Sequence, residues 1–313
     1  MVPAIAQQIG IATLDRFHAR QGDEFLLDSY GTVPGAWGRL FGRSSDRSWS
    51  PTIAGLDYQL EPRFDGHLWG LQTGLDLLGR ENENGGQDRF GLFFAHTEAH
   101  GDAIGNTLAL LQNRAGELAI EGNGLGAYWT RIGPDGWYID AVAMVTWFRG
   151  DATSDRGIGA DISGNAVLAS LESGYPFALA HGWTLEPQAQ LILQHINLDD
   201  TSDPFSSIGY DGFNSLTGRL GLRLEGNTTL NGVPIQPFVD VNLWHDFSSS
   251  YTVVFNDQSV RTSLGGTSLE FGGGISAQVT ENVSTYGALH FTTSLDGAGS
   301  KGFGGNVGLR VKW

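Results

Sequence analysis

The chain of 313 residues contains no cysteine, and only two of its 18 basic residues, Lys301 and Lys312, are lysines. The absence of cysteine excludes a disulfide framework and any thiolate chemistry. The net charge of −16 argues against the basic surface with which proteins bind nucleic acid. Long apolar runs are also missing, because no run approaches the ~18 residues that a membrane-spanning helix needs.

Glycine and aromatic residues, by contrast, are abundant, with 46 Gly, 17 Phe, 9 Trp and 8 Tyr. This composition, with only 17% charged residues, suits a transmembrane β-barrel, whose strands need alternation rather than long apolar runs. Residues 3–21 have helical spacing of apolar side chains, with Pro3 in the first turn and Gly22 as a stop. After this stretch the hydrophobic period changes from 3.6 to 2.

The alternation predicts twelve β-strands. In the last of them Val307, Leu309 and Val311 share one face, whereas Arg310 and Lys312 share the other. The expected strands cover residues 35–44, 64–79, 88–102, 117–132, 136–150, 163–179, 183–198, 212–225, 235–246, 267–279, 283–295 and 303–313.

The connections between these strands alternate in length along much of the chain. Residues 133–135, 180–182 and 280–282 are short connections, whereas residues 45–63, 103–116, 151–162, 199–211 and 247–266 are long ones. Short periplasmic turns and long external loops are typical of outer-membrane barrels. We therefore predict an all-β fold, a twelve-stranded antiparallel transmembrane up-and-down β-barrel, with the strand ends at both termini on the periplasmic side.

Aromatic residues gather at the short-turn ends of the strands. Rings of this kind lie at the lipid headgroups and form an aromatic girdle. The expected girdle consists of Trp129, Trp137, Tyr138, Tyr175, Phe177 and Trp183.

The polar faces of the strands would line the lumen, either as a salt-bridged interior or as a hydrophilic conduit for a polypeptide, and the two are compatible. The expected lining residues are Arg39, Gln72, Glu172, Glu186, Gln188, Gln190, Arg219, Arg223, Asp240, Asn242, Glu270 and Arg310. The expected helix carries the polar residues Gln7, Gln8, Asp15, Arg16 and Arg20. Because these residues disfavour lipid, we expect the helix in the lumen, with its arginines near Glu172, Glu186 or Asp240.

Catalytic motifs are scarce. The Gly272, Gly274 and Ala277 pattern lies in a strand without a following helix, which argues against a dinucleotide site. His96 and His100 would lie ~13 Å apart along a strand, too far to share one metal ion. Residues 199–203 read as a solvated acidic loop rather than a calcium site. We expect no catalytic residue, cofactor or metal.

Two alternatives stay open: a barrel hydrolase with a rim site near His245 and Asp246, and a soluble all-β binding protein.

Several segments, taken in order and spacing, resemble the translocator β-domain of autotransporters, the proteins of type V secretion. The resemblance covers nearly the whole chain and ends at its carboxyl terminus. It is carried by AWGRLFG (36–42), FDGHLWGLQTGLDL (64–77), GAYWTRIGPDGWYIDAV (126–142), SLESGYPFAL (170–179), LEPQAQL (185–191), RLGLR (219–223), QPFVDVNLWH (236–245) and GGNVGLRVKW (304–313).

The resemblance implies a helix threaded through the barrel, residues 1–22, and an outer-membrane barrel, residues 23–313, that conducts and anchors an upstream passenger in a Gram-negative bacterium. It implies the passenger, membrane lipid and the barrel-assembly machinery as partners of a monomer, and Trp313 as an assembly signal. Residues 1–15 lack the basic n-region of a signal peptide, so we expect the precursor to extend upstream. Some family members cleave at an Asn of the helix, but this chain has no Asn before Asn82.

Overall fold

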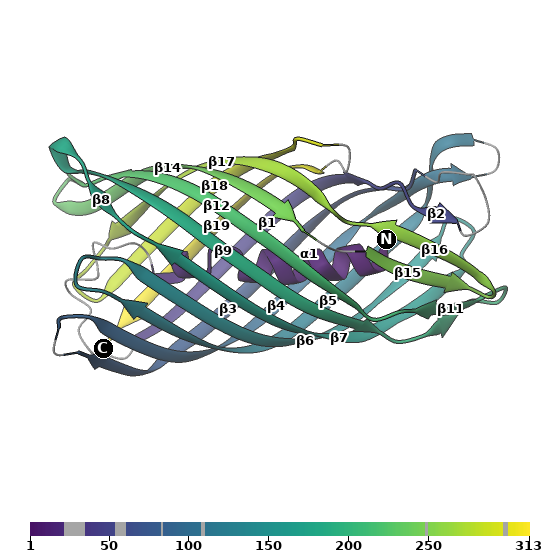
Figure 1. Cartoon of the computed structure of the whole chain (residues 1–313), viewed down its shortest axis with the longest axis horizontal. Helices are drawn as coiled ribbons and strands as arrows, with labels where there is room; N and C mark the ends of the chain where they lie inside the picture. Colours follow the sequence, from purple (N-terminus) through teal and green to yellow (C-terminus); the bar gives the residue numbers. More distant parts are fainter. Residues whose placement is uncertain (22–34, 54–60, 83, 108–109, 248–249, 297–299) are drawn as a thin grey trace.

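The computed structural model describes residues 1–21, 35–53, 61–82, 84–107, 110–247, 250–296 and 300–313. Twelve antiparallel strands close into a barrel, which confirms the predicted fold (Figure 1). They are β1 (Gly35–Ser48), β3 (Arg63–Glu81), β4 (Gln87–Thr107), β5 (Leu110–Ile132), β6 (Tyr138–Ser154), β7 (Gly159–Gly174), β9 (Trp183–Leu198), β12 (Phe213–Gly226), β14 (Val233–Asp246), β17 (Gly266–Gln278), β18 (Val283–Ser294) and β19 (Ser300–Lys312).

Each barrel strand pairs with the next one along the chain, and β1 closes the barrel against β19, with Gly35 opposite Lys312. At the end of the short turns, β8 (Phe177–Ala178), the 3₁₀ turn η3 (Ala180–Gly182) and β13 (Thr228–Leu230) extend two hairpins. The hairpin after β13 turns at Asn231 and Gly232, whose φ angles of 51° and 84° suit a tight turn that matches the twist of the strands.

The strands carry apolar side chains on the outer face and polar side chains on the inner face, the reverse of a water-soluble barrel. Along β3, Leu71, Leu75 and Leu77 are exposed, whereas Gln72 and Asp76 between them are buried. An apolar outer band around a polar interior is the pattern of a transmembrane barrel, since lipid covers the outer face.

The amino-terminal segment runs inside the barrel (Figure 1). It forms the helix α1 (Val2–Leu14) and, after a break, the 3₁₀ turn η1 (Phe17–Gln21). The expected single helix over 3–21 is therefore wrong in its carboxyl-terminal part, because the helix ends at Leu14 and Arg16 has a left-handed φ of 45°. All of α1 except Ala12 is buried, because the barrel wall surrounds it. No helix among the described residues is long and apolar enough to span a membrane.

Three of the expected long loops contribute a second sheet that the sequence did not predict. It consists of β2 (Thr52–Ile53), β10 (Thr201–Ser202), β11 (Ser207–Tyr210), β15 (Ser250–Phe255) and β16 (Gln258–Ser263), in the order β10-β11-β15-β16-β2. This sheet lies at the end of the barrel where the chain begins, opposite the carboxyl terminus (Figure 1). We call this end the mouth.

Glycines on the inner wall leave room for aromatic rings of neighbouring strands. A Cβ atom at Gly74 would lie 2.5 Å from the indole of Trp37, and one at Gly126 would overlap the ring of Phe93. The rings therefore lie flat against backbone, an arrangement that only glycine permits.

Candidate functional site

The candidate site is the lumen around the carboxyl end of α1. The described helix and strands bring the polar residues expected there into the interior. Gln188 is half-buried, and the other eleven are buried, namely Arg39, Gln72, Glu172, Glu186, Gln190, Arg219, Arg223, Asp240, Asn242, Glu270 and Arg310.

Wall residues cap the last turn of α1, where helix carbonyls have no partner within the helix. The guanidinium of Arg39 donates to the carbonyls of Thr13 and Asp15, at 3.0 Å each. Gln72 Nε2 donates to the Thr13 carbonyl at 2.8 Å, and Gln190 Nε2 donates to the Leu14 carbonyl at 2.8 Å. The positive charge of Arg39 also lies at the negative end of the helix dipole, where it is stabilising.

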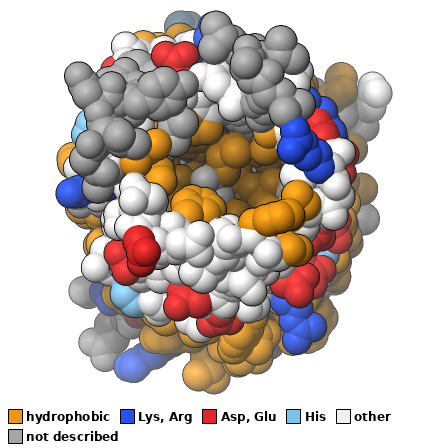
Figure 2. Space-filling view, turned by 90° about the vertical axis from the view of Figure 1, so that its right-hand side faces the viewer, with side chains coloured by type: hydrophobic (Ala, Val, Ile, Leu, Met, Phe, Trp, Pro, Cys, Tyr) orange, Lys and Arg blue, Asp and Glu red, His pale blue; other side chains and the backbone are white. Residues whose placement is uncertain are grey.

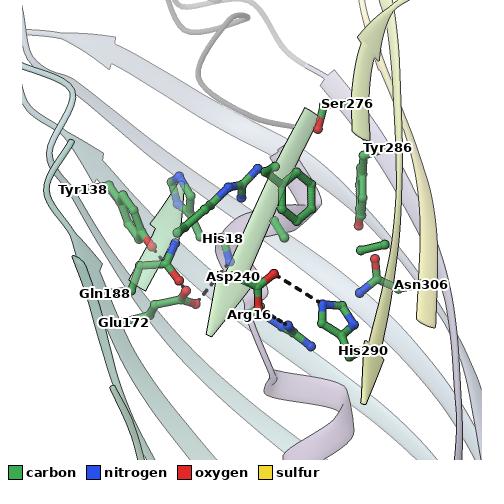
Figure 3. A pocket seen from close by; sticks show the side chains of 14 residues that line it. Arg16, His18, Tyr138, Glu172, Gln188, Asp240, Ser276, Tyr286, His290 and Asn306 are labelled. Carbon is green, nitrogen blue, oxygen red and sulfur yellow. Dashed lines mark hydrogen bonds and ion pairs between the residues drawn. The ribbon is translucent and has the colours of Figure 1, made fainter. Parts of the chain in front are cut away.

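At the break, Arg16 meets carboxylates of two strands. Its guanidinium lies 3.3 Å from Glu270 Oε1, 3.5 Å from Asp240 Oδ1 and 3.0 Å from Asp15 Oδ2. His290 Nε2 lies 3.8 Å from Asp240 on the other side, as Figure 3 shows. The sequence anticipated contact between Arg16 and Asp240, but Glu270 is the closer of the two wall carboxylates.

The following residues also face the wall. The His18 ring stacks on Tyr138 with centroids 3.5 Å apart, and its Nδ1 pairs with Asp140. The His18 amide donates to Glu172 Oε2 at 3.3 Å (Figure 3). Arg219 of β12 donates to Glu172 Oε1 at 2.8 Å. Glu172, expected as an arginine partner of the helix, is therefore bound by Arg219 of the wall and by His18. The side chain of Arg20 lies outside the described residues.

Phe17 packs into an aromatic box of the wall formed by Trp37, Phe93 and Tyr128. Its ring centroid lies 5.6, 4.9 and 5.5 Å from theirs, in that order. Sequence reasoning missed this box, because aromatic residues on lumen-facing positions of three strands give no pattern that relates them to residue 17.

The polar residues of α1 also meet the wall. Gln7 Nε2 donates to Ser215 Oγ at 2.6 Å, and Gln194 Nε2 donates to the Gln7 carbonyl at 3.3 Å. Gln8 is buried as well. The side chains that made the helix unsuitable for lipid therefore lie inside the barrel.

Of the expected girdle, Tyr175, Phe177 and Trp183 are exposed, and Trp129 and Trp137 are half-buried. The expectation for Tyr138 is wrong, because its side chain is only 1% exposed and stacks on His18 in the lumen. Tyr138 is the first residue of β6 and its side chain faces the lumen, whereas Trp137 precedes the strand.

Two exposed tryptophans that sequence reasoning missed, Trp69 and Trp147, lie nearer the mouth end of the apolar face. Trp69 Nε1 donates to Glu98 Oε2 at 3.0 Å, so the indole lies on the apolar face while its N–H binds a polar residue. Amphipathic rings of this kind suit the second membrane–water interface.

The mouth holds the beginning of the chain. The Met1 amine donates to the hydroxyl of Tyr251 in β15 at 3.1 Å. Burial raises the pKa of Tyr251, and that of Tyr210 in β11, to about 12. Viewed from this end, the barrel opens into a hollow lined by apolar side chains, with acidic side chains on its rim (Figure 2).

The rim residues considered for hydrolysis or metal binding have other roles. His245 and Asp246 point to opposite faces of β14, where His245 Nδ1 meets Thr267 Oγ1 at 2.9 Å and Asp246 accepts from Thr217 at 2.5 Å. The amides of Phe205 and Ser206 lower the pKa of Asp203. Across the described ranges no three histidine or acidic side chains are grouped to hold a metal ion.

Comparisons with known proteins agree with this architecture. The model of the autotransporter β-domain family matches residues 36–290. The adhesin BmaC autotransporter of Brucella suis is 31% identical over 266 residues, and the pertactin autotransporter of Bordetella bronchiseptica is 28% identical over 268 residues. These alignments cover 80% and 82% of the chain but only 7% and 27% of the relatives, so the chain spans a minor part of their length.

Solved structures show the same fold at lower identity. The transport unit of the autotransporter AIDA-I from Escherichia coli has a TM-score of 0.71 at 18% identity, over 99% of this chain and 98% of that chain. The β-domain of the Bordetella autotransporter BrkA has a TM-score of 0.67 at 20% identity, over 90% of this chain and all of that chain.

Proposed function

This chain belongs to the autotransporter β-domain family, and on that premise we propose that it conducts an upstream passenger polypeptide across the outer membrane and anchors it there. The outer membrane is the location of the family's barrels, and this chain is a barrel of that kind. The proposed partners are the passenger, membrane lipid and the barrel-assembly machinery, and the proposed state is a monomer without a catalytic step.

The course of the amino-terminal segment carries the proposal. The segment passes through the lumen, with η1 and the carboxyl end of α1 deep inside and Met1 beside Tyr251 at the mouth. Polypeptide upstream of Met1 would therefore leave through the mouth, at the end that carries the second sheet. The long connections and this sheet would face outward, and the short turns would face the periplasm.

In this proposal residues 1–22 are a plug and residues 23–313 are the barrel. The polar wall offers donors and acceptors to a passing backbone, and once the passenger has crossed, the same wall holds α1. Because the helix is buried on nearly every side, it closes the lumen.

The proposal is tested with a tagged passenger segment fused upstream of Met1. Antibody should bind the tag on intact cells, and external protease should remove it. A matched control carries the same tag at Glu281, in the short turn before β18, where binding should require permeabilised cells. A passenger tag that stays inaccessible while the barrel is inserted would contradict the proposal.

A further inference from the structure

Three consecutive residues after α1 enter three different sectors of the barrel wall. Arg16 faces the carboxylates of β14 and β17, Phe17 enters the aromatic box of β1, β4 and β5, and His18 lies against β6 and β7. We call Arg16–Phe17–His18 the anchor tripeptide.

The break in the helix makes this divergence possible. Arg16 has a φ of 45°, in the left-handed region that is uncommon for a residue with a side chain. A strained backbone of this kind persists only when its surroundings hold it, and such strain gathers at functional positions. Here the capping of the Asp15 carbonyl by Arg39 on one side and the burial of Phe17 on the other hold it.

The aromatic box is held together by the wall itself. Trp37 Nε1 donates to the Tyr128 hydroxyl at 3.0 Å, and that hydroxyl donates to Asp76 Oδ1 at 2.5 Å. Asp76 in turn pairs with Arg310. These contacts do not involve Phe17, so the wall presents a preformed apolar site in a polar lumen, and the Phe17 side chain is only 1% exposed there.

The neighbouring site selects a different side chain. Asp140 is buried, accepts from Thr130, and meets the His18 imidazole, whose ring also lies flat on Tyr138. A phenyl ring could stack on Tyr138, but it would leave the Asp140 carboxylate without its imidazole partner. The two adjacent sites are therefore chemically distinct, one apolar and one acidic.

We infer that the anchor tripeptide is the element that fixes the plug. Phe17 and His18 are its positioning residues, because the aromatic box accepts only the first of them and the Asp140 site only the second. The inference rests on the proposed function, and it names which residues of the plug determine closure. Ion pairing by Arg16 alone would tolerate sliding among several carboxylates, whereas a ring in a box and an imidazole on one carboxylate define a single register.

The test compares full-length variants by single-channel recording in planar bilayers. Phe17→Ala should increase the open probability about tenfold or more, because it removes a buried ring and its aromatic contacts. The decisive variant exchanges the two residues, Phe17→His with His18→Phe, which keeps composition and charge. It should open the channel as Phe17→Ala does, since each side chain then meets the wrong site.

A matched control is Phe64→Ala, which removes another buried ring on the inner wall of β3. It should lower thermal stability without raising the open probability. Residues 17 and 18 are not part of the barrel wall, so heat-modifiable gel mobility should confirm an intact barrel for their variants. An exchange variant that stays as closed as the unaltered chain would overturn the inference, as would equal opening by Phe64→Ala. Because passenger exposure is measured separately on cells, these outcomes are distinguishable from failure of the proposed function.

Discussion

Arg39 is predicted to hold the carboxyl end of α1, and the structure allows the size of its effect to be estimated. Arg39→Ala removes the donors at 3.0 Å from the carbonyls of Thr13 and Asp15. The Thr13 carbonyl keeps Gln72 as a donor, whereas the part-buried Asp15 carbonyl and the buried Gln72 Oε1, 2.7 Å from Arg39 Nε, both lose Arg39. An unsatisfied buried acceptor costs about 1–3 kcal/mol. The lost charge at the helix terminus adds about 0.3–1 kcal/mol. Because water can enter the space left behind and the Asp15 carbonyl is only part-buried, the low end of the summed range, about 2 kcal/mol, is expected.

Hydrogen exchange measures this effect in the full-length protein. The amides of α1 should exchange roughly 30-fold faster in Arg39→Ala, since 1.4 kcal/mol corresponds to a factor of ten in the opening equilibrium. Arg39→Lys keeps the charge but not the several donors of the guanidinium. Its α1 amides should exchange at a rate between those of the unaltered protein and of Arg39→Ala. The control is Arg63→Ala, which breaks a partly exposed ion pair with Asp46 outside the lumen and should leave α1 unchanged. Unaltered exchange of α1 in Arg39→Ala would refute the capping role.

Three further predictions concern the barrel. An epitope at Gly209 in β11 should bind antibody on intact cells, whereas one at Asp135 should not, and binding at Asp135 without permeabilisation would reverse the topology. Trp313→Ser should reduce membrane insertion, as seen in the yield of heat-modifiable protein, because it removes the exposed ring that directly follows β19. An unchanged yield would contradict this. Gly74→Val should destabilise the barrel by about 1–3 kcal/mol through overlap with Trp37. Thermal unfolding should show less than additive loss when it is combined with Trp37→Ala, and simple additivity would argue against the overlap.

The twelve strands were predictable because two solvents act on them. Lipid outside and a polar lumen inside impose strict alternation, and that period is visible in segments such as Val307 to Lys312. In the second sheet at the mouth the contrast is weaker, because the buried Tyr251 and Val253 of β15 alternate with the half-buried Thr252 and Val254. A signal for it does exist in the run from Tyr251 to Phe255, followed by the turn at Asn256, whose φ is 53°.

The candidate site was predictable in its chemistry but not in its partners. Alternation identifies which residues face inward, yet it cannot show that Arg16 lies closer to Glu270 than to Asp240. The misplacement of Tyr138 has a related cause. With Trp137 and Tyr138 adjacent at a strand end, composition alone does not decide which ring faces lipid, and burial shows that Tyr138 faces inward.

The lumen proposed here must release a passing chain and yet hold the last segment of it. Polar wall residues allow a passing chain to be released. Gln72 and Gln190 can replace a hydrogen bond to water by one to any backbone carbonyl, and each such bond stabilises the complex by only about 0.5–1.5 kcal/mol. Such contacts cannot distinguish one segment from another, because every residue carries a carbonyl. Retention of one register therefore depends on side chains, and the box around Phe17 supplies an apolar site that a large apolar side chain fills and a polar one does not. Polar capping and aromatic anchoring thus act at different stages, the first on any chain in the lumen and the second on this segment.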